Sequence, residues 1–354
     1  MTIGTTLAVG IIEGFFGRPW GWAARQSAVE FLRKWDYQFY IYAPKADPFL
    51  RRRWREPIPS ETMQHLADLK ERCRRNGIAL GLGLSPFEIY LNYNAEAARD
   101  LQSKVRQINE VGAETLCILF DDMQGHLDKL AEQQGRVISD ICNWSTAKTF
   151  IVCPTYYSDD PRLTQQFGSA PAAYLQDLGR MVDTRVEFFW TGEKVISHGY
   201  SRQHLADISS KIGRKPFIWD NSIANDSKTR VNFLFLDPSA GWELSIEQVA
   251  GFAINPMNQP YLSRIALAGY QLLLSGARGI LLSDAAYEVC GRSFADRLLE
   301  DAHLLQTRGL AGLGSEARAA LLGRYACDAG NPYAQEISSW LRGEYAFDPQ
   351  CLTD

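Results

Sequence analysis

Eight short apolar runs recur along the chain, and each of them ends in polar residues. Their starts lie about 30 to 40 residues apart, with stretches of helical periodicity between them. Apolar runs of this length are typical of buried parallel strands, and the helices between them provide the crossover connections. The runs cover residues 7–16, 39–42, 78–84, 115–120, 149–152, 186–190, 216–219 and 251–254. Helices are expected at residues 23–34, 60–75, 95–110, 124–142, 171–183 and 201–211.

Eight strand–helix units within about 275 residues match the length and count of a (β/α)8 barrel. The main alternative, a doubly wound open sheet, usually carries a glycine-rich phosphate loop after its first strand. Here the first strand runs into Glu13-Gly14-Phe15-Phe16-Gly17, which does not fit that loop. The sequence therefore predicts an α/β fold, a TIM-like barrel over residues 1–275.

The character of the sequence changes after this region. Residues 283–340 are rich in Ala, Leu and Arg in helical patterns, with breaks at Gly309, Gly312, Gly314 and Asn331-Pro332. We expect residues 276–354 to form a short helical appendage packed on the barrel.

Charge and apolar patterning exclude several classes of protein. The 37 basic and 41 acidic residues give a net charge of −4, which does not favour binding to nucleic acid. The most apolar stretch, residues 265–282, is interrupted by glycines and Arg278, so no membrane span is expected. The seven cysteines are scattered and never spaced as CxxC, and the first residues lack a secretory signal pattern. These features predict reduced thiols and a cytoplasmic location.

The polar ends of the apolar runs indicate where chemistry occurs, because barrels of this kind carry their active sites at the carboxyl ends of the strands. Nearly every run ends in a hydrogen-bonding group, and several tryptophans and tyrosines lie among these groups. Polar groups surrounded by aromatic rings suit a sugar, which has hydroxyls to pair and an apolar face to stack. Carbohydrate is therefore the first substrate class to consider.

The pair Asp121-Asp122 at the end of the fourth run is the sharpest element. When two carboxylates lie side by side in a pocket, their repulsion raises the pKa of one of them, so that one acts as an acid and the other as a base. A purely structural alternative is that one Asp caps the next helix while the other meets a cation. A third interpretation is a metal site with the nearby His126, although the chain has only five histidines. We expect no metal and no cofactor.

A glycosidase with its own nucleophile needs a second carboxylate across the scissile bond. Neighbouring aspartates do not easily straddle that bond, and no other strand end offers an obvious second partner except Glu13 and Asp226. This points to a substrate that supplies its own nucleophile, as a 2-acetamido group does.

The charged run Arg51-Arg52-Arg53-Trp54-Arg55 follows the second strand. We interpret it as a solvated loop with paired arginines, in preference to a site for phosphate or an acidic ligand.

Taken in order, the strand-end motifs resemble those of glycoside hydrolase family 84, the β-N-acetylglucosaminidases that include the O-GlcNAcases. The resemblance covers roughly residues 9 to 260. The motifs are Glu13-Gly14-Phe15-Phe16-Gly17-Arg18-Pro19-Trp20, Tyr42-Ala43-Pro44-Lys45, Leu84-Ser85-Pro86, Phe120-Asp121-Asp122, Cys153-Pro154-Thr155, Trp190-Thr191-Gly192 and Trp219-Asp220-Asn221.

The resemblance implies a retaining exo-β-N-acetylglucosaminidase that works through an oxazoline intermediate. Asp121 would orient the 2-acetamido group, and Asp122 would act as acid and then base. Tyr157 would hydrogen-bond near the anomeric centre and, with Cys153 and Trp219, shape the acetamide pocket. The sugar hydroxyls would be held by Gly14, Lys45, Asn221, Asp226 and Asn255. The implied partner is a glycan or glycoprotein that contains N-acetylglucosamine.

Three positions depart from the family pattern: Ala46 follows the lysine, Phe87 replaces a usual glycine and Tyr156 replaces a usual glutamate. None removes a catalytic group, but they leave open the identity of the leaving group. Two other hypotheses remain at this point. One is a catalytically silent barrel that binds N-acetylglucosamine, and the other is a metal-dependent lyase or aldolase barrel.

Overall fold

Eight parallel strands close into a single barrel in the computed structural model, which describes residues 7–238, 244–276 and 282–353. The strands follow one another in chain order around the barrel, and β1 pairs with β8 to close it. Their bounds are β1 Ala8–Glu13, β2 Phe39–Tyr42, β3 Ala79–Leu84, β4 Thr115–Leu119, β5 Thr149–Cys153, β6 Val186–Trp190, β7 Phe217–Asp220 and β8 Gly251–Ile254. The predicted (β/α)8 fold is confirmed.

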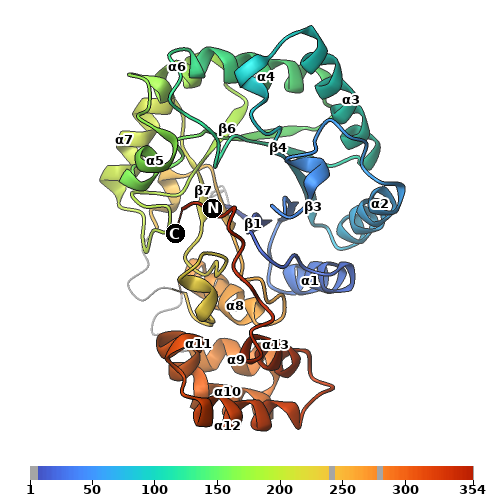
Figure 1. Cartoon of the computed structure of the whole chain (residues 1–354), viewed down its shortest axis with the longest axis vertical. Helices are drawn as coiled ribbons and strands as arrows, with labels where there is room; N and C mark the ends of the chain where they lie inside the picture. Colours follow the sequence, from blue (N-terminus) through green and yellow to red (C-terminus); the bar gives the residue numbers. More distant parts are fainter. Residues whose placement is uncertain (1–6, 239–243, 277–281, 354) are drawn as a thin grey trace, which may run out of the picture.

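Helices cover the outside of the barrel (Figure 1). They are α1 Trp22–Lys34, α2 Ser60–Arg75, α3 Ala95–Val111, α4 Leu130–Trp144, α5 Pro161–Phe167, α6 Tyr174–Met181, α7 Arg202–Ile212 and α8 Ser263–Leu274. Local signals set several of these bounds. In α3, for example, the Asn94 side chain accepts hydrogen bonds from the amides of Glu96 and Ala97, and Gly112 ends the helix with a φ of 71°.

Besides α8, which was not among the expected helices, two helices differ from the sequence-based prediction. The helix expected at 124–142 begins only at Leu130, because the preceding residues form the loop that leaves β4. The helix α5 was not expected; its first turn contains Pro161, and the Asp160 side chain accepts a hydrogen bond from the Arg162 amide. Both differences lie in connections on the carboxyl side of the strands, where loops serve the site as well as the fold.

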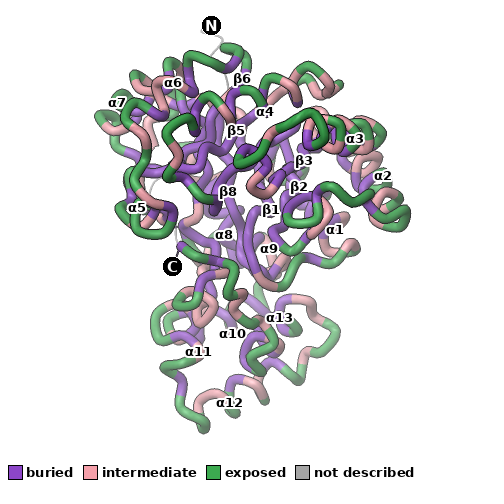
Figure 2. Tube along the Cα trace, turned by 45° about the horizontal axis from the view of Figure 1, so that its top comes forward, coloured by how far each residue is buried: buried purple, intermediate pink, exposed green. Residues whose placement is uncertain are grey.

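Aromatic rings fill part of the barrel interior, and glycines make room for them. The ring of Phe217 lies 5.7 Å from that of Phe39 and 5.4 Å from that of Phe189. A β-carbon on Gly10 would lie 2.3 Å from the Phe39 ring, and one on Gly251 would lie 2.3 Å from the Phe217 ring. The interior is therefore a packed core, and Figure 2 shows its strands buried beneath an exposed outer surface.

The remaining helices lie together below the barrel in Figure 1. They are α9 Leu282–Cys290, α10 Arg292–His303, α11 Gly309–Gly312, α12 Ser315–Ala326 and α13 Pro332–Leu341, with a π-helical turn over Leu304–Arg308. The expected boundary at residues 275 and 276 adjoins a stretch outside the described residues, 277–281, and stays a prediction. After α13 the chain is no longer helical and returns to the barrel.

Buried polar contacts join these helices to the barrel. The Trp340 indole donates to the Val231 carbonyl at 3.1 Å. The buried Glu336 carboxylate on α13 accepts from the amides of Tyr261 and Leu262, immediately before α8, with N···O distances of 2.8 to 3.1 Å. These amides belong to the start of a helix, where N–H groups lack intrahelical partners, so Glu336 caps α8 from outside. Among the described residues, no helix is long and apolar enough to cross a membrane.

Replacing Glu336 by Ala should lower the free energy of unfolding by roughly 2 to 4 kcal/mol, because two buried amides lose their acceptor. Chemical denaturation measures this loss. The matched control is Glu316→Ala, an exposed glutamate in the first turn of α12, which should stay within about 0.5 kcal/mol of the parent. Equal effects of the two changes would contradict the capping role.

Candidate active site

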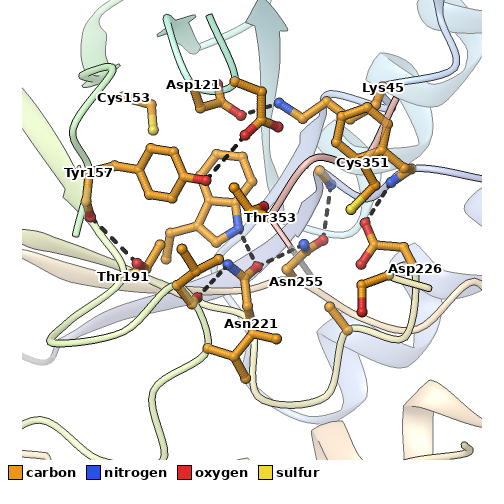
Figure 3. Close-up of a pocket in the computed structure, with 18 residues that line it drawn as sticks. Lys45, Asp121, Cys153, Tyr157, Thr191, Asn221, Asp226, Asn255, Cys351 and Thr353 are labelled. Carbon is orange, nitrogen blue, oxygen red and sulfur yellow. Dashed lines mark hydrogen bonds and ion pairs between the residues drawn. The ribbon is translucent and has the colours of Figure 1, made fainter. Parts of the chain in front are cut away.

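All ten site residues expected from the sequence line one cavity at the carboxyl ends of the strands (Figure 3). They are Gly14, Lys45, Asp121, Asp122, Cys153, Tyr157, Trp219, Asn221, Asp226 and Asn255. The cavity encloses about 550 Å³ of space, which includes solvent at its open mouth. Barrel closure thus brings together side chains that are spread over more than 240 positions of the sequence.

The backbone turns sharply at Asp122, and this turn brings both aspartates to the cavity. Beyond β4 the Phe120 amide still donates to the Cys153 carbonyl at 2.9 Å, which continues the strand ladder by one step. Asp122 then adopts a left-handed conformation with a φ of 58°. Aspartate tolerates this region better than most residues, but the conformation is still sparsely populated. A regular strand would have sent the two side chains to opposite faces.

Lys45, at the end of β2, forms a buried ion pair with Oδ2 of Asp121. The other oxygen of this carboxylate, Oδ1, is buried and has no hydrogen-bond partner among the described residues. A buried acceptor without a donor is costly in a folded protein, so its presence indicates a group that a ligand satisfies. Asp121 therefore offers one oxygen to an N–H or O–H donor in the cavity.

Asp122 is placed differently from its neighbour. Burial, followed by the negative charge of Asp121, raises the pKa of Asp122 to about 6. The nearby cations Lys45 and Arg51 and a hydrogen bond from the Tyr157 hydroxyl, at 3.2 Å, oppose this rise. Two adjacent carboxyls thus differ in their partners: one is paired with a cation, and the other gains a proton near pH 6.

A chain of hydrogen bonds fixes the opposite wall. The Trp219 indole donates to Asn221 Oδ1 at 2.9 Å, and Asn255 Nδ2 donates to the same oxygen at 2.9 Å. The Gly14 amide in turn donates to Asn255 Oδ1 at 3.1 Å. A β-carbon on Gly14 would lie 2.3 Å from the Trp219 ring, so only glycine lets the indole occupy its place. Asp226 is held from the first loop, since its Oδ2 accepts from the Phe16 amide at 2.7 Å.

Glu13 is not available as a second acid, although the sequence left it as a candidate. It is fully buried between β1 and α1, where Arg25 donates to both of its oxygens at 2.6 and 2.9 Å. The Tyr40 hydroxyl also donates to it at 2.6 Å. Glu13 therefore supports the fold beneath the cavity and does not line it.

His126, the histidine weighed as a metal ligand, is exposed and its Nδ1 lies 3.3 Å from the Ser169 carbonyl. It does not line the cavity. Within residues 7–238, 244–276 and 282–353, no group of three or more His, Cys, Asp or Glu side chains is placed to hold a metal.

The arginine run was interpreted wrongly in one respect. Arg52, Arg53 and Arg55 are exposed as expected, but Arg51 is only 2% exposed and faces the carboxylate pair. Burial lowers the pKa of Arg51, and the charges of Asp122 and Asp121 oppose that change. An arginine in a charged run looks solvated in sequence, and only the closure of the β2–α2 loop over the barrel buries this one.

Several other residues of the cavity were missed as site residues. Phe16, Thr191, Val195, Ile196, Ala224 and Ser227 come from loops after strands, and Cys351 and Thr353 come from the far end of the sequence. The loop residues follow the carboxyl ends of predicted strands, so their position in the sequence could have identified them as candidate site residues. The last two carry no sequence signal, because nothing in the pattern indicates that residues beyond α13 return to the barrel.

A family model described as beta-N-acetylglucosaminidase matches residues 9–286, which include all of the barrel strands except the first residue of β1. The chain belongs to this family. The Protein O-GlcNAcases of Mus musculus and Rattus norvegicus are each 31% identical to it over 260 residues. That match covers 70% of this chain but only 28% of either relative. A mutant O-GlcNAc hydrolase of Thermobaculum terrenum has a similar structure, with a TM-score of 0.74 at 27% identity over 95% of this chain and 74% of that one.

Family membership confirms the resemblance that the ordered strand-end motifs indicated. Within this member of the beta-N-acetylglucosaminidase family, two of the unusual residues have clear positions. The half-buried Phe87 ring packs under Arg51 and Arg52, at 5.1 and 4.3 Å from their guanidinium carbons. Tyr156 turns away from the cavity, and its hydroxyl donates to the Gly168 carbonyl at 2.6 Å. Of these two residues, Phe87 is the one connected to the site, because Arg51 above its ring interacts with Asp121 and Asp122.

Replacing Asp121 by Asn should lower the pKa of Asp122 from about 6 toward the ordinary aspartate value, because a neighbouring negative charge is removed while Lys45 and Arg51 remain. Difference infrared titration of the protonated carboxyl band measures this shift. Asp159→Asn serves as the control, since this partly exposed aspartate pairs with His204 and Lys211 away from the cavity. An unchanged titration in the Asp121 variant would show that the two carboxyls do not interact.

Proposed function

We propose that the protein is a retaining exo-β-N-acetylglucosaminidase that removes terminal β-linked N-acetylglucosamine through participation of the 2-acetamido group. The observation that carries this proposal is the Asp121 carboxylate, with one oxygen paired to Lys45 and the other buried without a donor. An acetamido N–H supplies the missing donor. No second carboxylate with the freedom of a nucleophile is needed, which agrees with the buried, fully engaged Glu13.

The first step forms a bond between the acetamido oxygen and the anomeric carbon while the glycosidic bond breaks. Asp121 accepts the N–H, which makes the carbonyl oxygen a better nucleophile. Asp122 gives its proton to the leaving oxygen, and its raised pKa suits that task because the proton is still present in mildly acidic solution. The products of this step are the free aglycone, an ionised Asp122 and a bicyclic oxazoline in its N-protonated form, whose N–H stays hydrogen-bonded to the Asp121 carboxylate.

The second step reverses these roles. Asp122, now a carboxylate, takes a proton from a water molecule whose oxygen attacks the anomeric carbon. The oxazoline ring opens, and the acetamido group is restored. Two inversions at the same carbon give overall retention. Lys45 stabilises the Asp121 charge in both steps, while the Tyr157 hydroxyl positions Asp122.

The rest of the cavity fits a single sugar unit. Trp219 offers an aromatic wall, and Asn221, Asn255 and Asp226 carry the amide and carboxylate groups that pair with hydroxyls. The natural substrate would be a glycan or glycoprotein that carries N-acetylglucosamine. The mouse and rat relatives are named Protein O-GlcNAcases, which indicates a protein aglycone for those proteins.

The direct test is hydrolysis of an aryl β-N-acetylglucosaminide by the pure protein between pH 4 and 8. Turnover with retained configuration supports the proposal. Binding of N-acetylglucosamine without any hydrolysis would identify a silent sugar-binding barrel, and loss of activity in a chelator would identify a metal-dependent enzyme.

Replacing Asp122 by Asn should reduce kcat/KM by about 10²- to 10⁴-fold for substrates with poor leaving groups and far less for activated aryl substrates. The reason is that an activated leaving group departs without a proton. A series of aryl substrates of graded leaving-group acidity measures the difference. Asp159→Asn is again the matched control and should leave the series unchanged. Equal losses across the series would contradict the acid role.

Stepwise fluorination of the acetamide methyl should slow the wild-type reaction progressively, because each fluorine makes the carbonyl oxygen less basic. The measurement is kcat/KM for aryl substrates with the acetyl, fluoroacetyl, difluoroacetyl and trifluoroacetyl groups. A flat series would assign the nucleophile to the protein and overturn the proposed mechanism.

A further inference from the structure

Residues 344–353, which we call the return segment, run from the end of α13 back to the mouth of the barrel (Figure 1). The first contacts lie along the β1–α1 loop. The Arg18 guanidinium lies 3.7 Å from the Glu344 carboxylate and packs over the Tyr345 ring, with 5.1 Å between its carbon and the ring centre. These contacts direct the segment across the top of the barrel.

The middle of the return segment is held by the arginine loop after β2. Gln350 Oε1 accepts from Arg52 Nε at 2.6 Å and from Arg51 Nη1 at 3.4 Å. Asp348 folds the chain into a turn here, because it accepts from the amides of Gln350 at 2.9 Å and Cys351 at 3.0 Å. The unusual Phe87 lies beneath the same two arginines, so it supports this contact.

The end of the return segment lies inside the candidate active site. Cys351 and Thr353 line the cavity and are only 8% and 7% exposed, whereas Leu352 between them is 45% exposed. Thr353 lines the same cavity as Tyr157 and the two aspartates. In Figure 3 it stands in the middle of the cavity, among the side chains that would hold the sugar. Tyr157 is also the residue that donates to Asp122.

A sugar placed for the proposed reaction needs its anomeric centre beside Asp122 and Tyr157. Thr353 fills part of that space, so sugar and segment compete for it. We propose that the return segment is a built-in competitive inhibitor, which occupies the sugar site in the resting protein and must swing out before substrate binds. This inference rests on the proposed function, because it assigns the cavity to N-acetylglucosamine.

The contacts that keep the return segment in the cavity allow it to open reversibly. The Gln350 side chain is one anchor of the segment, and both Gln350 and Arg52 are exposed to solvent. Segments with few buried contacts and exposed hydrogen bonds open at a small fraction of the free energy of global unfolding. When the competent state is only partly populated, the apparent affinity for a ligand falls in proportion. The segment therefore weakens substrate binding without changing the chemical step.

Cysteine labelling tests whether the return segment leaves the cavity when a ligand binds or stays in place. The rate of alkylation of Cys351 by iodoacetamide is measured by peptide mass spectrometry, with and without a saturating N-acetylglucosamine-derived thiazoline. Displacement of the segment should raise the rate several-fold. Cys327, exposed on the far helices, is the internal control and should not respond. A slower or unchanged rate at Cys351 would show that the segment stays in place as part of the wall, and would overturn the inference.

Kinetics gives an independent test in the full chain. Gln350→Ala removes this anchor and should lower KM for an aryl β-N-acetylglucosaminide by about two- to tenfold at unchanged kcat. Gln203→Ala is the matched control, since this exposed glutamine on α7 makes one hydrogen bond, to Asp207. Turnover with the same KM in wild type and Gln350→Ala would overturn the inhibitor while leaving the proposed function intact. Absence of both turnover and thiazoline binding in wild type and variant would overturn the proposed function itself.

Discussion

The buried ion pair between Lys45 and Asp121 sets the chemistry of the cavity, because it decides which of two adjacent carboxyls carries the negative charge. With Asp121 matched to a cation, the second acid is left with burial and a like charge beside it, and its pKa rises to about 6. A buried ion pair contributes little net stability in general, since desolvation offsets the attraction. Its value here is positional: it orients one carboxylate oxygen away from the lysine and into the cavity, where no described residue satisfies it.

That arrangement depends on a strained backbone conformation at Asp122 and on well-packed side chains beneath the cavity. The left-handed turn at Asp122 directs two successive side chains into one space, and it persists because the surrounding barrel over-determines it. Beneath this turn, hydrogen bonds from Arg25 and Tyr40 to the Glu13 carboxylate hold the end of β1 in place. Gly14 then lets the Trp219 indole fill the space above. The acids of this barrel thus divide into one that builds the scaffold and a pair that faces the ligand.

The helix α13 and the return segment, which lie outside the barrel, also contact elements of the site. Glu336 caps α8 from the far helices, and this contact holds α13 against the barrel. From there the return segment reaches the arginine loop and the cavity. These contacts give a structural reason for Phe87, which departs from the family pattern. Its ring packs against Arg51 and Arg52, the two arginines that donate hydrogen bonds to Gln350. Phe87 is thereby linked, through the arginines, to the proposed movement of the return segment and not to the proposed chemistry.

The sequence by itself determined the barrel, because eight apolar runs with helices between them leave few other ways to bury the strands. It also placed all ten expected residues around one cavity, since parallel strands bring their carboxyl ends to the same face. Other features depended on long-range contacts that no local pattern encodes. Glu13 ends β1 and Asp122 follows β4, so both looked like site acids, and only the tertiary contacts with Arg25 and Tyr40 show that Glu13 is structural. Arg51 belongs to a run that looks solvated, and loop closure buried it. The return of residues 344–353 to the cavity was decided by tertiary structure alone, because its contacts join positions about 300 residues apart.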